Sequence, residues 1–369
     1  MVSSLFKSWL APKTGTSRKT VYLHIGISKT GTTAIQKFLN GETENLAAAG
    51  VQYLRAGRNT GGESHHRLAR IYKAGSCGRG VLENIRQEIL GSDCHSFVVS
   101  SEMFEYLEAR SISRLKRDFS GFRLVLVVYL RYQDQAMSSM YNELVKKHAC
   151  DLSFSEHVST TPRKDLLLYG KMLDKWSKAL GKENIRARIF EKDRFYNGDL
   201  IQDFLNVIDV AGTAFESRSF QKNEAVSSVV VQILSDINRS MSYSVDHAKH
   251  YGPACKLSGI LTRLIKEQFP EIAGNTNSFF SSESEYNNFI EYYERDNAKI
   301  SKKYLGGEPF RPSGFVKRAA LAEVDKVKVL SALAKRLGLE VEQGVTTSQY
   351  YTSEIAGYWS SELQRLCES

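Results

Sequence analysis

Continuous apolar runs that end at a polar residue or a glycine are the feature that most constrains this chain. The clearest are VYLHIG at 21–26, SFVVSS at 96–101 and RLVLVVYL at 123–130. Such runs lack the alternation of a half-exposed strand and are typical of parallel strands buried on both faces. Helical patterns such as TAIQKFLN at 33–40 separate them. The alternation predicts an α/β fold, a doubly wound and mostly parallel sheet with helices on both faces.

The rest of the chain continues this pattern and then becomes helical. NIRARIFEK at 184–192 predicts a fourth strand, and AALAEVDKVKVLSALAKRL at 319–337 predicts a late helix. We therefore expect an N-terminal arm at 1–19, an α/β domain at 20–311 and a helical C-terminal extension at 312–369.

Composition excludes several classes of protein. The five cysteines are scattered without a C-x-x-C pair, which argues against a disulfide scaffold or a zinc ribbon and suits a reducing compartment. The longest apolar run, LVLVVYL, is far shorter than the roughly 20 residues of a membrane span. The first twenty residues lack the apolar core of a secretory signal. We expect a cytoplasmic protein with no transmembrane segment and no metal site.

The net charge of the chain is +9, from 50 Lys and Arg against 41 Asp and Glu. This excess suits an anionic partner such as a phosphate, a nucleotide or an acidic glycan. No RNP-type aromatic stretch, zinc finger or basic heptad region is present, so the sequence does not indicate a nucleic-acid partner. The sequence does not indicate the oligomeric state of the protein.

The stretch HIGISKTGTT at 24–33 is the most specific motif in the chain. It places a glycine-containing loop between a buried strand and the start of a helix, where backbone N–H groups form a cradle for an anion. Lys29 adds a mobile positive charge, and threonine hydroxyls add further donors. The motif therefore predicts a site for phosphate-like groups at the end of the first strand.

This loop differs from the Walker A motif of kinases and NTPases, G-x-x-x-x-G-K-[ST]. Gly26 and Gly31 keep the Walker spacing, but Thr32 stands where that motif needs its lysine. The lysine has moved inside the loop, to position 29.

A displaced lysine of this kind resembles the 5′-phosphosulfate loop of sulfotransferases that use 3′-phosphoadenosine 5′-phosphosulfate (PAPS). Members of that family also have a strand that ends in Arg, with a Ser eight residues later, and these two residues hold the 3′-phosphate. The run YLRYQDQAMSSMYNELVK carries Arg131 and Ser139 at this spacing, with Ser138 as an adjacent alternative. Arginine suits the role because its planar guanidinium binds phosphate oxygens in a bidentate way.

The resemblance covers roughly residues 20–310 and is strongest to bacterial sulfotransferases thought to modify saccharides. It rests on HIGISKTGTTAIQKFL, VVSSEMF, YLRYQDQAMSSMYNELVK and LYGKMLDKWSKALGKENIRARIFEKDRF, in this order. It implies a P-loop-like sulfotransferase fold and transfer of a sulfuryl group from PAPS to a hydroxyl or amine of a saccharide. These motifs are specific to the cosubstrate and do not identify the acceptor.

The resemblance also implies roles for individual residues. Lys29 would stabilise the charge that develops on the leaving 5′-phosphate, and Lys222, in FQKNEAVSS, would belong to a late basic loop that closes over the nucleotide. The full set of residues implied to bind the cosubstrate is Ser28, Lys29, Thr30, Gly31, Thr32, Thr33, Arg131, Ser139 and Lys222.

A general base is needed to take the proton of the attacking acceptor group. Glu102, directly after SFVVSS, is one candidate, and the pair His65 and His66 is the other. Neighbouring residues on a helix point in different directions, so at most one histidine would act, and we include His66 among the catalytic candidates. The carboxyl ends of parallel strands share one edge of a sheet, so Lys29, Glu102 and Arg131 are expected to line one cleft.

Two other functions stay open from the sequence. A P-loop kinase or NTPase needs the missing Walker lysine and an acidic magnesium partner after a strand, a place that Glu102 alone imitates. A non-catalytic protein that binds glycans or nucleotides would be expected to have lost Lys29, Arg131 or Ser139, and all three are present.

Overall fold

The computed structural model describes residues 18–27, 29–148, 150–210, 227–241, 251–272, 278–312, 314–317, 321–341, 344 and 347–368. By contacts the chain divides into two units. Unit 1 consists of 1–132, 168–222 and 294–311, and unit 2 consists of 133–167, 223–293 and 312–369. The sequence predicts a different division, which follows the motifs and gives the ranges 1–19, 20–311 and 312–369. This division stays a prediction.

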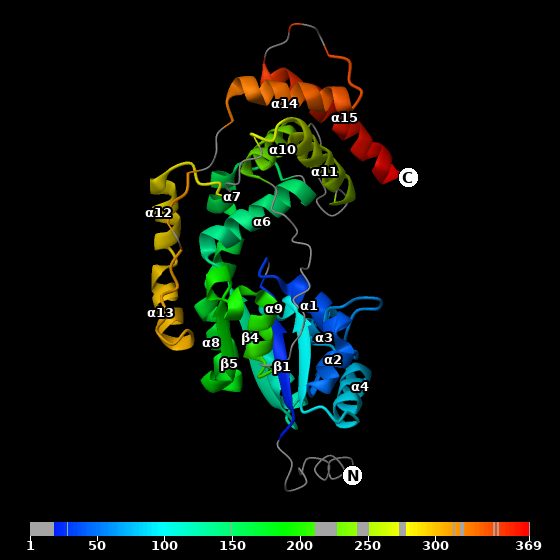
Figure 1. Ribbon diagram of the computed structural model, residues 1–369, viewed down its shortest axis with the longest axis vertical. Coiled ribbons are helices and arrows are strands. Elements are labelled where there is room, and N and C mark those ends of the chain that lie inside the picture. The colour runs from blue at the N-terminus through cyan, green and yellow to red at the C-terminus, as the bar shows by residue number, and fades with distance from the viewer. Residues whose placement is uncertain are drawn as a thin grey trace. The chain divides into compact units, whose positions relative to one another are not determined.

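Unit 1 is built around a five-stranded sheet (Figure 1). Its strands are β1 (Thr20–Ile25), β2 (Val51–Tyr53), β3 (Ser96–Ser101), β4 (Arg123–Leu130) and β5 (Ile185–Ile189). The order is β2-β3-β1-β4-β5, and every pair of neighbours is parallel. The predicted parallel α/β sheet is therefore confirmed.

Helices and short 3₁₀ turns account for most of the remaining described residues of unit 1. They are α1 (Thr32–Gly41), α2 (Thr43–Ala48), α3 (His66–Lys73), α4 (Arg79–Leu90), η1 (Glu102–Tyr106), α5 (Ala109–Asp118), α8 (Tyr169–Leu180), η3 (Lys182–Asn184), η4 (Lys192–Arg194), η5 (Tyr196–Gly198), α9 (Leu200–Val207) and α13 (Glu294–Tyr304).

Helices cover both faces of the sheet, as the continuous apolar strands predict. On one face Tyr22, Val98 and Val125 form an apolar cluster with Phe38 of α1 and Phe204 of α9. Side chains alternate across a strand, so the residues between them reach the opposite face. There α5 packs on both α3 and α8, α3 packs on β3, and α8 packs on β4 and β5. Burial on two faces explains why β1, β3 and β4 read as continuous apolar runs.

Strand β2 was not predicted from the sequence. Val51–Tyr53 has three residues, which is too few to show a periodicity, and it pairs only with β3 at the edge of the sheet. With β2 and β3 on one side and β4 and β5 on the other, β1 lies in the middle of the sheet. The chain leaves β1 toward one side of the sheet and leaves β4 toward the other, which makes the ends of these two strands a topological switch point.

The described part of unit 2 is helical. Its elements are α6 (Gln133–His148), α7 (Phe154–Thr160), η2 (Pro162–Leu167), α10 (Ser228–Ser240), α11 (Tyr251–Gln268), α12 (Glu283–Glu291), α14 (Glu323–Arg336) and α15 (Ser348–Glu368). Helix α6 packs on α10 and α11, and α15 packs on α10 and α14. The helix predicted at 319–337 is observed as α14, and Ala319 and Ala320 of that prediction lie outside the described residues. Within the described ranges, we find no helix with the length and apolar character needed to cross a bilayer.

Candidate functional site

The loop after β1 begins at Gly26, which lies between two side chains. A Cβ atom at Gly26 would overlap with Oγ1 of Thr32 and would lie 2.8 Å from Cγ of Glu102. Gly26 also donates its N–H to the carbonyl of Ser101 at 3.4 Å. This hydrogen bond comes one residue after Ile25, the last residue of β1 that pairs with β3. The absence of a side chain at Gly26 therefore lets Glu102 lie directly against the start of the loop.

Left-handed backbone at two positions shapes the rest of the loop. Gly31 has a φ of 73°, and a Cβ atom there would overlap with Cδ2 of Leu200. Lys29 has a φ of 69°, a backbone conformation that residues other than glycine, Asn and Asp seldom adopt. Strained backbone of this kind is found more often at ligand-binding and catalytic sites than elsewhere. Lys29 is half-buried and has an unusual backbone conformation within the candidate loop.

The start of α1 presents backbone donors. In the described part of the chain, no hydrogen bond occupies the N–H groups of Gly31, Thr32 or Thr33, the first donors of the helix. The buried hydroxyl of Thr32 also lacks a partner there. Thr30 is different, because both its N–H and its hydroxyl donate to the carbonyl of Ile27, at 3.2 and 2.7 Å. Thr30 therefore stabilises the turn, while Thr32 and the N–H groups have the chemistry of an anion site.

Arg131 joins this loop from the end of β4. Its Nη1 donates to the main-chain carbonyl of Lys29 at 3.1 Å, and its guanidinium carbon lies 6.0 Å from the ring centroid of Phe190. Phe190 also lies beside Gly31, since a Cβ there would be 3.2 Å from its ring. The structure thus brings the Arg131 guanidinium to the loop that carries Lys29, at the switch point between β1 and β4.

Glu102 follows β3 and opens the 3₁₀ helix η1. In a 3₁₀ helix, residues three apart lie above one another, so Glu105 shares a face with Glu102. Burial, with the nearby Glu102 charge as a second cause, raises the pKa of Glu105 to about 8. Sequence reasoning missed Glu105, although the E-x-x-E spacing was visible, because its burial depends on packing. Burial and the neighbouring Glu102 charge therefore favour the protonated form of Glu105.

Substituting Glu105 with glutamine is expected to flatten the pH dependence of stability. Because its folded-state pKa lies above the usual 4.5, the folded protein holds this proton more tightly than the unfolded chain, and stability falls as pH rises through this window. Glu105→Gln should therefore melt at a higher temperature than wild type near pH 8.5 and differ less near pH 5. Differential scanning fluorimetry would measure this, with the exposed Glu108→Gln as control. Equal slopes in wild type and Glu105→Gln would contradict it.

The structure separates the two candidate histidines. His65 is fully buried, packs edge-on against Tyr53 at 5.1 Å and accepts the N–H of Ser100 at 3.2 Å. Burial lowers the pKa of His65 to about 3, so it is a neutral core side chain. His66 is half-buried at the start of α3, with Nδ1 2.7 Å from Oγ of Ser101, directly before Glu102. His66 therefore contacts the last residue of β3, the strand that Glu102 follows.

A buried polar group lies beneath the loop. Nδ1 of His24 is 2.8 Å from Oγ of Ser100, and Gln36 of α1 donates to the same oxygen at 3.0 Å. Burial lowers the pKa of His24 to about 3, and its ring packs edge-on against Phe204 at 5.3 Å. Since this residue is neutral and enclosed, we assign it a structural role: it helps to tie α1 to β1 and β3.

The remaining predicted residues are not brought to this loop by any described contact. Ser139 is half-buried and Ser138 buried on α6, which belongs to unit 2. Ser28 and Lys222 lie outside the described residues. The roles of Ser139, Ser28 and Lys222 stay predictions. Among the described residues, no three His, Cys, Asp or Glu side chains gather as a metal site.

The chain has distant similarity to a curated protein and to a solved structure. No family model matches the chain. An uncharacterized protein from Archaeoglobus fulgidus is 25% identical over 210 residues, 57% of this chain and 54% of that protein. The chain thus spans about half the length of this curated relative. A sulfotransferase crystal structure from Alicyclobacillus acidocaldarius matches 56% of this chain and 88% of its own, at 13% identity and a TM-score of 0.35. This likeness is too weak to argue function, which must come from the site.

Proposed function

We propose that this chain is a sulfotransferase that moves a sulfuryl group from PAPS to a hydroxyl or amine of a saccharide. The observation that carries the proposal is the hydrogen bond from Arg131 to the carbonyl of Lys29. It joins the two cationic motifs of the family resemblance at neighbouring ends of parallel strands, which is where open α/β sheets bind nucleotides.

The residues at this edge fit a cosubstrate with phosphate and sulfate groups. The N–H groups of Gly31, Thr32 and Thr33 point from a helix start, and the buried Thr32 hydroxyl lacks a partner within the described residues. Oxyanions satisfy such donors. Together with Lys29 they would hold the 5′-phosphosulfate, while Arg131 would hold the 3′-phosphate. PAPS, when bound, supplies an activated sulfuryl group.

The chemistry asked of the protein is positioning and charge stabilisation. An acceptor oxygen or nitrogen forms a new bond to sulfur as the sulfur–oxygen bond to the 5′-phosphate breaks, much as in phosphoryl transfer. Lys29 and the loop N–H groups stabilise the charge that develops on the departing phosphate. Glu102 accepts the acceptor's proton, with His66 beside it as the alternative. The roles of Lys29 and Glu102 do not need a metal ion, and the proposed reaction proceeds without one.

The kinase or NTPase alternative is less well supported by the same residues. Thr32, at the Walker lysine position, has its side-chain oxygen buried against Gly26. After β3 and β4 the chain continues with Glu102 and Arg131 rather than an aspartate. An arginine at the second place suits a nucleotide phosphate better than a magnesium ion.

Binding of the desulfated product, 3′-phosphoadenosine 5′-phosphate, tests the proposal most directly. A ligand that binds only the folded state stabilises it, by about 2.7 kcal/mol at a hundredfold excess over Kd. We expect a clear rise in Tm for wild type, most of it lost in Arg131→Ala, because a charge-assisted contact to phosphate disappears. Arg117→Ala, an exposed arginine on α5, is the matched control. A larger shift with ATP and Mg²⁺ would favour a kinase, and no shift with the 3′-phosphorylated nucleotide would overturn the proposal.

A further inference from the structure

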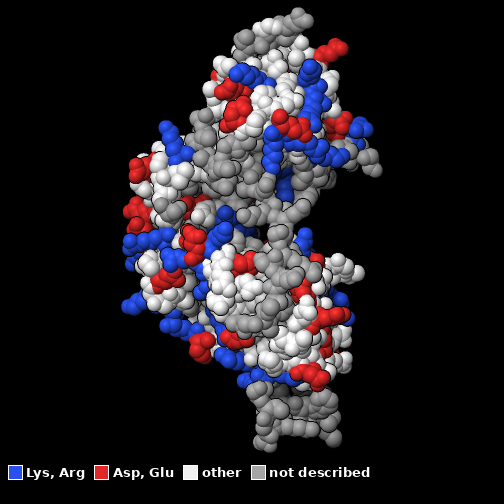
Figure 2. Space-filling view, viewed as in Figure 1, with Lys and Arg blue, Asp and Glu red and all other residues white. Residues whose placement is uncertain are grey.

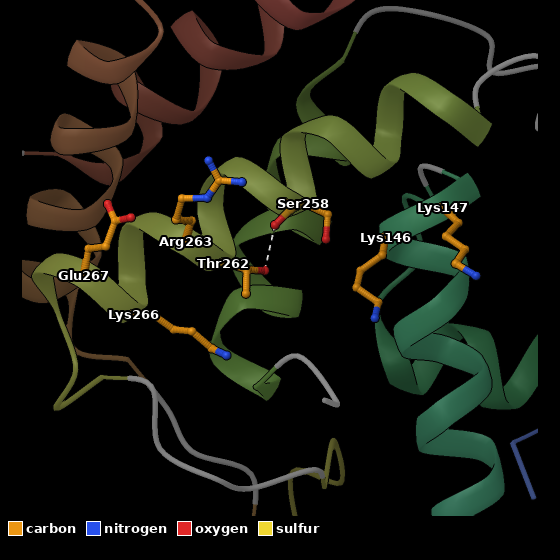
Figure 3. A pocket seen from close by; sticks show the side chains of 8 residues that line it. Lys146, Lys147, Ser258, Thr262, Arg263, Lys266 and Glu267 are labelled. Carbon is orange, nitrogen blue, oxygen red and sulfur yellow. Dashed lines mark hydrogen bonds between the residues drawn. The ribbon is translucent and has the colours of Figure 1, made fainter. Parts of the chain in front are cut away.

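A pocket of about 590 Å³ lies between α6 and α11 in unit 2 (Figure 3). This volume falls within the range of small-ligand sites. The polar and charged side chains that matter here are Lys146 and Lys147 of α6 and Ser258, Thr262, Arg263 and Lys266 of α11. None of these residues belongs to the proposed PAPS site.

The helix pattern of α11 explains how the pocket is lined. Ser258, Thr262 and Lys266 are spaced four residues apart and therefore share one face of the helix. Gly259, beside them, has no side chain to fill the space, and no atom of another element lies within 4 Å of where its Cβ would be. Lys146 and Lys266 extend into the space between the two helices from opposite sides (Figure 3). Two ammonium groups thus border a floor of small and hydroxyl side chains.

Positive charge dominates this pocket. Four of its lining residues are cationic, and the one carboxylate, Glu267, is paired with Arg336 at 2.8 Å. Lys147 is paired with Glu143 at 2.8 Å, whereas Arg263 is exposed on the rim and forms no ion pair with a described residue. Lys and Arg side chains also gather over α11 and its neighbours on the face drawn in Figure 2. An anionic ligand is therefore strongly favoured over a neutral one.

The lining chemistry also restricts the kind of anion. No aromatic ring is among the described lining residues, and proteins that bind single-stranded nucleic acid use such rings to stack the bases. The Thr262 hydroxyl donates to the carbonyl of Ser258 at 2.7 Å (Figure 3), so its oxygen is left to accept a hydrogen bond from a ligand. An accepting hydroxyl oxygen next to ammonium groups suits a ligand with many hydroxyls and separated anionic groups, and the volume exceeds that of a single phosphate. We propose that this pocket binds an acidic oligosaccharide, a short sugar chain with carboxylate or sulfate groups. This inference goes beyond the proposed function and does not depend on sulfuryl transfer.

Calorimetry on the full chain tests the inference. The probes are a hexamer of galacturonic acid, a sulfated maltohexaose, neutral maltohexaose and inorganic phosphate. We expect both acidic sugars to bind, more weakly in 0.5 M salt, and the neutral sugar not to bind. Lys146→Ala/Lys266→Ala should raise the Kd at least about tenfold. Lys302→Ala/Lys328→Ala removes two positive charges outside the pocket and should leave the Kd unchanged.

Several results would overturn the inference: neither acidic sugar binds, neutral maltohexaose binds as tightly, inorganic phosphate competes at equal concentration, or both double variants weaken binding equally. Lys266→Gln alone, expected to weaken binding severalfold, replaces the double variant if that one fails to fold.

The Tm shift with 3′-phosphoadenosine 5′-phosphate should persist in Lys146→Ala/Lys266→Ala. If that shift is absent in wild type while the acidic sugars bind, the proposed function fails and the pocket inference stands. If the shift disappears only in the pocket variant, the pocket binds the nucleotide and the inference fails.

Discussion

Lys29→Ala is expected to lower kcat for sulfuryl transfer about a hundredfold or more. The lysine acts on charge that develops only in the transition state, so its loss should affect the rate more than substrate binding. Lys29 is half-buried in the loop, where its main-chain carbonyl accepts a hydrogen bond from Arg131, and it is not part of the apolar core. Alanine there should change Tm by only a few degrees. Transfer from labelled PAPS to glycans, followed by mass spectrometry, measures the rate.

Lys37→Ala provides the control for Lys29→Ala. Lys37 is exposed on α1, eight residues further along the chain, and its removal changes the net charge equally. It should keep wild-type turnover. Near-normal turnover in Lys29→Ala would show that this loop does not bind the phosphosulfate.

Glu102→Gln is expected to lower kcat by about 10²–10⁴ while cosubstrate binding stays nearly intact. Glutamine keeps the shape and hydrogen-bonding capacity of the side chain beside Gly26 but cannot accept the acceptor's proton. The Kd for 3′-phosphoadenosine 5′-phosphate should therefore remain close to wild type, measured by calorimetry alongside the rate. Normal turnover in Glu102→Gln, together with an inactive His66→Ala, would assign the base to His66.

A pH–rate profile alone does not separate these two bases. Burial, followed by the charge of Arg70, lowers the pKa of His66 below the usual 6.5. A histidine base at this position would keep its activity at a lower pH than an exposed histidine, and a carboxylate base would do the same. The two substitutions therefore decide the assignment, and the pH profile then describes the residue that they identify.

The positions of several candidate residues could be predicted because strand ends are local features. A buried apolar run shows where a strand ends, and parallel pairing places such ends at one edge. Lys29 and Arg131, 102 residues apart, were expected to share an edge on this basis, and the structure joins them by a hydrogen bond. The same reasoning placed Glu102 beside the loop, where it lies against Gly26.

Features that depend on tertiary packing could not be predicted. The raised pKa of Glu105 follows from burial, and the different environments of His65 and His66 follow from the direction in which α3 begins. The assignment of α6 to a separate unit depends on its packing against α10 and α11. The basic pocket depends on the same packing, because Lys146 and Lys266 are 120 residues apart and neither forms part of a motif.

The close approach at Gly26 has an evolutionary consequence. Its neighbours Thr32 and Glu102 leave no room for a β-carbon, so a larger residue at position 26 is compatible only with a simultaneous change in one or both of them. We therefore expect the three positions to covary, although 76 residues separate the first from the last. Among descendants of a common ancestor, the candidate anion-binding loop and the proposed base would be kept together or lost together.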